Sequence, residues 1–191
     1  MDEDIARSKQ LVLGEALARW ARKEPNRQAV IFRDRRLTFR EFDERVNRLA
    51  NGLANLGLQK GDRVALLSEN RPEWAISYFA IVSCGMVAVP IDKDLTEREV
   101  RHILEFAEVS SIVASPEYLV PLAADRSLLP LVSSFIVVDD QLHGADFTFS
   151  SLQEKGRVRI QQGDHRFADV TVSPEDLAVL IFTSGTTGAS K

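Results

Sequence analysis

Short apolar runs alternate with longer amphipathic stretches along most of this chain, and this alternation limits its fold more than any other feature of the sequence. Short, near-continuous apolar runs are typical of strands that are covered on both faces, as they are in a parallel sheet. The stretches between them have the periodicity of helices. We therefore predict an α/β fold with three layers, in which helices flank a mostly parallel sheet. The expected sheet strands are residues 63–68, 86–91, 111–114, 135–138 and 177–183.

Two of the expected helices have clear start signals. Thr38 and Glu41, and then Thr96 and Glu99, have the spacing of a capping box, in which two side chains satisfy free backbone N–H groups at a helix N-terminus. The stretch between residues 139 and 172 has little periodicity, and we expect only a short helix near residues 151–155 within it.

A further helix is expected to begin near residue 72. Asn70 is placed to cap it, Pro72 suits its first turn, and the carboxylate of Glu73 complements the helix dipole. Residues 70–74 also follow a strand at the edge of the sheet where ligands bind. A role on the substrate side therefore stays open as the alternative to helix capping.

The basic residues are concentrated near the N-terminus. Residues 19–48 hold ten basic and five acidic residues, whereas the whole chain has 24 basic and 28 acidic residues and a net charge of −4. Arg33, Arg35 and Arg36 lie in a polar break between two short apolar runs, which predicts the tip of a small antiparallel hairpin. We interpret them as solvated arginines, with attraction of an anionic ligand or a lipid surface as the alternative.

Composition excludes several classes of protein. A chain of 191 residues is one domain or a piece of a larger one, and its single cysteine, Cys84, excludes an intrachain disulfide and a multi-cysteine metal site. The acidic net charge argues against a nucleic-acid-binding protein. Residues 74–91 carry no charge, but Ser83, Gly85 and Pro90 interrupt them, so we interpret them as core rather than as a transmembrane segment. The N-terminus lacks a secretory signal, and we expect a cytoplasmic protein.

The most informative string is the last one, Leu-Ile-Phe-Thr-Ser-Gly-Thr-Thr-Gly-Ala-Ser-Lys over residues 180–191. An apolar strand runs directly into a turn rich in glycine and hydroxyl groups, at the sheet edge where ligands bind. Glycines let successive N–H groups point at one anion, and a lysine adds positive charge. We predict a polyphosphate site, with a plain surface turn as the alternative. Its candidate residues are Thr183, Ser184, Gly185, Thr186, Thr187, Gly188 and Lys191. The glycine spacing is not that of a Walker loop.

This string resembles the phosphate-binding loop of the adenylate-forming superfamily, which includes acyl-CoA synthetases, luciferase-like enzymes and peptide-synthetase adenylation domains. Ser190 stands where the family commonly has proline. The segments 37–42, 57–65 and 85–90 are similar to family segments in the same order. Within the superfamily, residues 68–74 and 90–96 look most like the long-chain fatty acyl-CoA ligases.

The resemblance implies a two-step ligation that uses ATP, Mg²⁺ and CoA: a carboxylate becomes an acyl-adenylate, and CoA then takes the acyl group. It implies that the loop holds the β- and γ-phosphates, that Thr183 is the Mg²⁺ ligand and that Lys191 offsets phosphate charge. Residues 1–191 would be the N-terminal subdomain, ending in the loop at 183–191. They would contain no catalytic residue, and the isolated chain would be inactive. The partners implied are a small-molecule carboxylate, ATP and CoA, with no nucleic acid.

Two alternatives stay open. One is an adenylating enzyme with another acceptor, such as an acyl-carrier protein or a peptide-synthetase domain. The other is a non-catalytic interaction domain with the same fold. Peripheral association with a membrane also stays open, and the sequence does not predict the oligomeric state.

A few other residue types could suggest chemistry. We interpret His102 as a solvated histidine on its helix and Cys84 as a small buried apolar residue. Asp139, Asp140, His143 and Asp146 lie in one polar loop, but their spacing matches no known metal motif, and we favour a solvated loop there.

Overall fold

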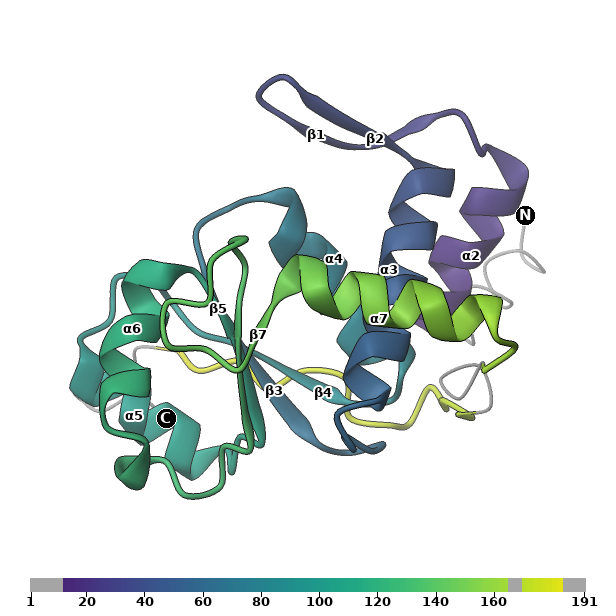
Figure 1. The fold of residues 1–191 in the computed structure, drawn as a ribbon. Coiled ribbons are helices and arrows are strands. Elements are labelled where there is room, and N and C mark those ends of the chain that lie inside the picture. The colour runs from purple at the N-terminus through teal and green to yellow at the C-terminus, as the bar shows by residue number, and fades with distance from the viewer. Residues whose placement is uncertain (1–11, 165–169, 184–191) are drawn as a thin grey trace.

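The computed structural model describes residues 12–164 and 170–183, and within them it contains the predicted parallel sheet (Figure 1). Five strands lie in the order β4-β3-β5-β6-β7, and every neighbouring pair is parallel. These strands are β3 (Arg63–Leu67), β4 (Val87–Pro90), β5 (Ser111–Ala114), β6 (Ser134–Val137) and β7 (Phe147–Thr148). The chain leaves β3 toward β4 and later returns to the other side of β3, so the strand order reverses between β3 and β5.

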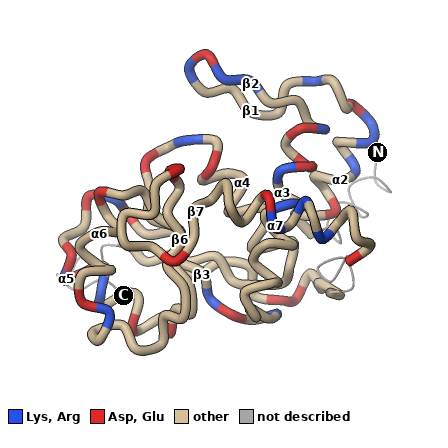
Figure 2. Tube along the Cα trace, in the orientation of Figure 1, with Lys and Arg blue, Asp and Glu red and all other residues tan. Residues whose placement is uncertain are grey.

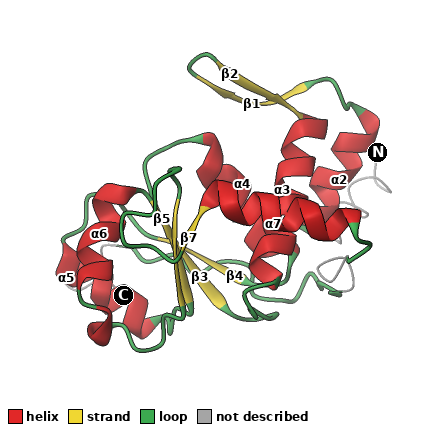
Figure 3. Ribbon diagram, viewed as in Figure 1, coloured by secondary structure: helices red, strands yellow, loops and turns green. Residues whose placement is uncertain are grey.

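Helices cover both faces of this sheet (Figure 3). One layer consists of α2 (Leu13–Lys23), α3 (Phe39–Ala54), α4 (Pro72–Ser83) and α7 (Phe149–Gln161). The other consists of α5 (Glu97–Phe106), α6 (Pro116–Ala124) and a short 3-10 helix, Arg126–Leu128. Within β3, Val64 and Leu66 pack under the first layer, whereas Ala65 and Leu67 pack under the second. The three-layered α/β fold is confirmed.

Capping boxes begin three of the helices. Both predicted boxes are present, because the hydroxyl of Thr38 accepts a hydrogen bond from the N–H of Glu41 at 3.2 Å and that of Thr96 accepts one from the N–H of Glu99 at 3.4 Å. A third box, which the sequence analysis did not predict, begins α7 at Thr148. Local hydrogen bonds thus determine where these helices start.

Helix α7 is 13 residues long, which corrects the expectation of a short helix near residues 151–155. Glycine lowers helix propensity, so Gly156 obscured the helix in the sequence. Its role is steric: a Cβ atom at Gly156 would lie 1.8 Å from the carbonyl oxygen of Arg48 in α3. The backbones of α3 and α7 are therefore in contact at a point that only glycine permits.

A small antiparallel hairpin, β1 (Gln28–Phe32) and β2 (Arg35–Thr38), projects from the body of the molecule (Figure 1). Phe32 lies opposite Arg35, and Ile31 lies opposite Arg36. Because side chains alternate along a strand, the first pair points to one face of the hairpin and the second pair to the other. The predicted hairpin and its arginine-rich tip are confirmed.

The segment 177–183 departs from the prediction of a buried strand. It makes one parallel bridge, between Val179 and Ala88 of β4. Two backbone hydrogen bonds form it, from the Ala88 N–H to the Ala178 oxygen at 3.0 Å and from the Leu180 N–H to the Ala88 oxygen at 2.9 Å. Leu177 and Ile181 are more than half exposed. Among the described residues no strand pairs with the other edge of this segment, which explains why its ladder is so short.

Residues 74–91 form most of α4 and all of β4, as the core interpretation requires. None of the helices in the described part of the chain combines the length and the apolar character needed to cross a bilayer.

Candidate phosphate-binding site at the carboxyl edge of the sheet

The segment 177–183 runs parallel to β4 and leads toward the carboxyl edge of the sheet. Val179 is level with Ala88, and β4 ends at Pro90, so the segment passes the end of β4 near residue 181. Leu180 and Phe182 pack against the core beneath α5 and α6, and the Phe182 ring meets the Phe106 ring edge-on with centroids 5.9 Å apart. Thr183 then lies exposed at this edge.

Of the predicted phosphate-binding residues, Thr183 is the one that the structure describes. The others, Ser184, Gly185, Thr186, Thr187, Gly188 and Lys191, lie outside the described residues. Their contacts with phosphate, and a Mg²⁺-binding role for Thr183, therefore stay predictions. The described residues show how the chain reaches this site. An extended segment anchored on β4 brings Thr183 to the edge where open α/β sheets bind ligands.

A network of charged side chains occupies the same edge at the ends of β3, β5 and β6. Arg71 is its centre: its guanidinium lies 2.8 Å from Glu73, 3.2 Å from Glu69 and 3.3 Å from Asp139. The hydroxyl of Ser115, just after β5, donates a hydrogen bond to Glu69 at 2.5 Å. Three strand ends are thus tied together by side chains that follow them directly.

This network spans the crevice that the strand order creates. In doubly wound sheets ligands bind where the order reverses, which here is between β3 and β5. The hydrogen bond between Ser115 and Glu69 spans that crevice. Thr183 emerges at the same end of the sheet, beside the outer edge of β4.

Glu73 is the most buried carboxylate of the network, and it is ionised. Burial raises the pKa of this carboxyl, but hydrogen bonds from Arg35 and Arg71 more than offset that effect and hold the pKa below its usual range. The Arg35 bond is 2.7 Å long and comes from the hairpin. In Glu69, burial likewise raises the pKa, and the Ser115 and Arg71 contacts bring it below the ordinary value.

These contacts correct two expectations. Asn70 does not cap α4; the N-cap residue is Arg71, and its side chain makes no capping hydrogen bond. Arg35 is not simply a solvated arginine, because it pairs with Glu73 across 38 residues of sequence. The sequence contained no periodic signal for the Arg35–Glu73 pair, because this pair depends on how the hairpin lies relative to the start of α4.

A polar cavity of about 660 Å³ opens beneath the hairpin, next to this network. Arg35, Arg45 and Arg71 line it together with Glu73, Asp139 and Asp140. Positive and negative side chains are mixed around it, so the cavity has no single-sign field that would select one class of ligand.

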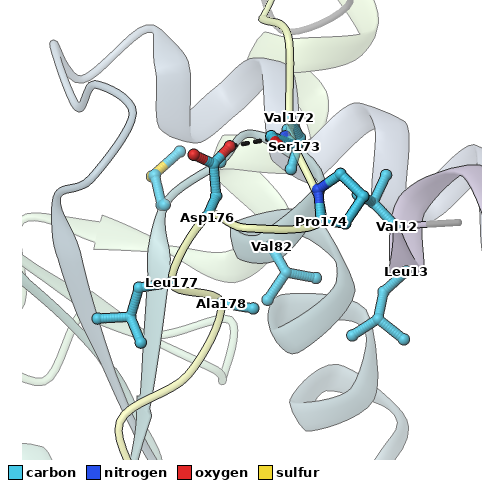
Figure 4. Close-up of a pocket in the computed structure, with 11 residues that line it drawn as sticks. Val12, Leu13, Val82, Val172, Ser173, Pro174, Asp176, Leu177 and Ala178 are labelled. Atoms are coloured by element: carbon cyan, nitrogen blue, oxygen red, sulfur yellow. Dashed lines mark hydrogen bonds between the residues drawn. The ribbon is translucent and has the colours of Figure 1, made fainter. Parts of the chain in front are cut away.

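A smaller cavity of about 230 Å³ lies at the opposite, amino-terminal end of β4 (Figure 4). Val82, Leu177 and Ala178 are among its apolar lining residues, and the Ser173 N–H donates to Asp176 at 2.7 Å on one side of it. Lys60 forms an ion pair with Asp176 and anchors this part of the chain. This cavity lies away from the carboxyl edge of the sheet and is therefore separate from the expected ligand site.

The remaining candidate residues have structural surroundings. Cys84 is buried, and burial raises the pKa of its thiol to about 12, so it is an inert apolar residue as predicted. His102 is exposed, also as predicted. Asp146 pairs with Arg126 at 2.8 Å and accepts a hydrogen bond from the N–H of Phe135. Across residues 12–164 and 170–183, no three His, Cys, Asp or Glu side chains are grouped as a metal ion would require.

Comparison with known proteins agrees with this arrangement. A long-chain-fatty-acid–CoA ligase of Bacillus subtilis (strain 168) is 32% identical over 201 residues, covering 95% of this chain and 35% of that protein. A feruloyl-CoA synthase of an Amycolatopsis species is 32% identical over 182 residues, covering 94% of this chain and 32% of that protein. The crystal structure of the anthranilate CoA ligase AuaEII in complex with anthranoyl-AMP superposes with a TM-score of 0.81 at 25% identity, covering 95% of this chain and 34% of that one.

The parallel α/β sheet and the segment beside β4 therefore define the N-terminal portion of an adenylate-forming enzyme. The family model described as AMP-binding enzyme matches residues 17–191, and the chain belongs to that family. It spans about a third of the length of the two curated CoA ligases compared above.

Proposed function

We propose that this chain is the ATP-phosphate-binding part of an AMP-forming acid–thiol ligase. In the first step, a carboxylate oxygen attacks the α-phosphorus of ATP, which gives an acyl-adenylate and releases pyrophosphate. In the second step, the thiol of CoA attacks the acyl carbon and AMP leaves. Family membership supports the reaction class, and the relatives compared above are CoA ligases by name.

One observation carries the proposal. The segment 177–183 is anchored on β4 and delivers Thr183, exposed, to the carboxyl edge of a parallel sheet. The residues that follow it in sequence are those of the predicted phosphate loop. A glycine-rich turn in that position can direct backbone N–H groups at the β- and γ-phosphates.

The proposed residue roles follow from their chemistry. Ser184, Thr186 and Thr187 donate hydroxyl hydrogen bonds to phosphate oxygens, and Gly185 and Gly188 permit the backbone conformation that exposes the N–H groups. Lys191 and Mg²⁺ are the groups proposed to offset the charge of the departing pyrophosphate.

Thr183 fits the role of a Mg²⁺ ligand on its donor chemistry. Mg²⁺ prefers oxygen ligands, and the Thr183 hydroxyl is exposed at the sheet edge. Bound there, Mg²⁺ supplies Lewis-acid stabilisation of phosphate oxygens. The residues of this chain then orient the polyphosphate, and the carboxylate and CoA bind to parts of the protein outside these residues.

The proposed substrate is a long-chain fatty acid. The segments 68–74 and 90–96 resemble the fatty acyl-CoA ligases, and one relative at 32% identity is named as such an enzyme. Other relatives are named for feruloyl and anthranilate substrates, which makes an aromatic acid the principal competitor. The isolated chain of 191 residues is proposed to be inactive, because it spans only about a third of its relatives.

Acid-dependent pyrophosphate release by the full-length protein tests this proposal. The panel consists of a long-chain fatty acid, ferulate, anthranilate and an amino acid, each with ATP and Mg²⁺ and with or without CoA. We expect the fatty acid to give the highest kcat/KM and CoA to be consumed in proportion. A higher kcat/KM for an aromatic acid would overturn the substrate class alone. Absence of pyrophosphate release with every acid would overturn the ligase function.

A further inference from the structure

The tip of the β1–β2 hairpin combines free positive charge with an exposed apolar side chain. Ile31 is 62% exposed and lies opposite the exposed Arg36 on the same face. The guanidinium of Arg33 stacks over the Phe32 ring, 5.2 Å from its centroid. We refer to Ile31, Phe32, Arg33 and Arg36 as the hairpin tip. It projects from the body of the molecule, with basic residues along it (Figure 2).

The positive charge of this region is not neutralised by the described part of the chain. Residues 19–40 include eight basic and two acidic residues, and among the described residues Arg35 is the one of the eight that forms an ion pair. The contrast with the rest of the molecule is clear. The paired basic residues elsewhere are Arg48, Lys60, Arg63, Arg71, Lys93, Arg101, Arg126, Arg157 and Arg159.

The base of the hairpin repeats the same combination of aromatic and basic groups. Trp20 is 39% exposed, and Lys23 and Arg27 lie 5.1 Å and 5.9 Å from the centroid of its ring. Its ring stacks on Phe39 with centroids 5.8 Å apart. The backbone of Arg27 accepts a hydrogen bond from the Phe39 N–H, which fixes this cluster beside the hairpin.

We propose that the hairpin tip, together with Trp20, Lys23 and Arg27, binds an anionic lipid surface. Arginine and lysine near such a surface are attracted to its negative potential, while tryptophan and isolated apolar side chains enter the interfacial region. A nucleic acid is a poorer fit, because a base would have to stack on the Trp20 ring. Phe39 already stacks on that ring, and Lys23 and Arg27 lie close to it. An acidic protein surface would pair with the cations but would gain nothing from Ile31. This lipid-binding surface is independent of the proposed ligase activity.

Co-sedimentation of the full-length protein with vesicles tests the proposal. The vesicles are phosphatidylcholine alone or an equimolar mixture of phosphatidylcholine and phosphatidylglycerol. We expect binding to the anionic vesicles, none to the neutral ones, and weaker binding as salt rises toward about 0.15 M.

Matched variants locate the surface. Removing two arginines in R33S/R36S is expected to weaken binding about 30-fold, since each contributes about fivefold near an anionic membrane. The control R98S/K155S removes the same charge from exposed positions on α5 and α7 and is expected to bind like the wild type. I31S is expected to lose roughly tenfold and to keep the salt dependence. Far-UV circular dichroism checks that each variant is folded.

Three results would overturn the proposal. One is no binding to anionic vesicles even at low salt. A second is that R33S/R36S and R98S/K155S weaken vesicle binding equally, which would show that binding depends only on the net charge of the protein. The third is unchanged binding of I31S together with equally tight binding of an oligonucleotide or polyglutamate, which would indicate a general polyanion site.

Discussion

Glu73 is a buried carboxylate between two guanidinium groups, Arg35 on the hairpin and Arg71 at the start of α4. Replacing it by glutamine keeps its shape but removes the charge that both arginines face. We expect Glu73→Gln to lower the free energy of unfolding by about 2 kcal/mol, as is usual when a buried charged hydrogen bond loses one partner. Urea unfolding measures this change. Glu154→Gln, which breaks an exposed pair with Arg157, is the control and should leave the midpoint unchanged. Equal effects of the two substitutions would contradict the role of Glu73.

The same carboxylate predicts a pH dependence with a definite sign. Burial raises the pKa of Glu73, but the two arginine hydrogen bonds hold it below its usual value in the folded state. Such a group stabilises the native state above its unfolded pKa of about 4.3, and this stabilisation is lost as pH falls through the folded pKa. The stability difference between the wild type and Glu73→Gln should therefore be full at pH 7 and shrink below about pH 4. A difference that stays constant or grows in acid would contradict the assignment.

Some residue-level features could be read from the sequence and others could not. The exposure of His102 follows from helix periodicity, and the burial of Cys84 follows from its place at the end of an apolar helix; both were predicted. The network around Arg71 was not, because its partner Asp139 lies 68 residues away in sequence. Contacts of this kind depend on which strand ends become neighbours, and a single sequence does not specify that directly.

At the level of elements, the close crossing of α3 and α7 gives the clearest test. Alanine has a higher helix propensity than glycine by about 1 kcal/mol, so Gly156→Ala would stabilise an unhindered helix. Here the added Cβ would lie 1.8 Å from the Arg48 carbonyl oxygen, and backbone cannot move aside cheaply. We expect a loss of about 3 kcal/mol in the free energy of unfolding, measured by urea unfolding. Lys155→Ala, at an exposed neighbouring position on α7, is the control. A gain in stability for Gly156→Ala would show that the helices do not pack in this way.

Helices and strands were predicted correctly where the sequence signal comes from residues close together in the chain. The capping boxes at Thr38 and Thr96 determine helix starts through hydrogen bonds within four residues, and both were found where expected. The final segment, 177–183, was predicted as a buried strand from its apolar run alone. Its burial depends on neighbours on both sides, and among the described residues only β4 supplies one.

For the molecule as a whole, the class of fold was predictable because the alternation of strands and helices, with apolar residues on every strand, permits few other arrangements. The mostly parallel sheet and its two helix layers follow from it. The order β4-β3-β5-β6-β7 was not predicted, since it depends on contacts between elements distant in sequence. Of the candidate phosphate site, the structure describes the approach through residues 177–183, and the roles of the loop residues remain predictions.

At the scale of the whole molecule, we expect activity from the full-length protein and not from the isolated chain. The chain spans about a third of the length of its relatives, so residues 1–191 are expected to bind ATP no better than about millimolar and to release no pyrophosphate with any carboxylate. Calorimetry and a pyrophosphate assay on the isolated chain measure both quantities. Micromolar, Mg²⁺-dependent ATP binding, or turnover that depends on an added acid, would contradict this.

We infer that the segment beside β4 delivers an ATP phosphate-binding loop to the carboxyl edge of the sheet. Acid-dependent exchange of labelled pyrophosphate into ATP by the full-length protein tests it most directly, because this exchange reports formation of the adenylate without the thiol step. We expect Lys191→Ala to lower the exchange rate about 100-fold, the usual cost of removing one charge-stabilising group from a transition state. Lys93→Ala, which removes an exposed lysine paired with Asp94, should leave the rate within about twofold, as for a surface ion pair. Equal exchange by the wild type and Lys191→Ala, with both proteins folded, would contradict the claim.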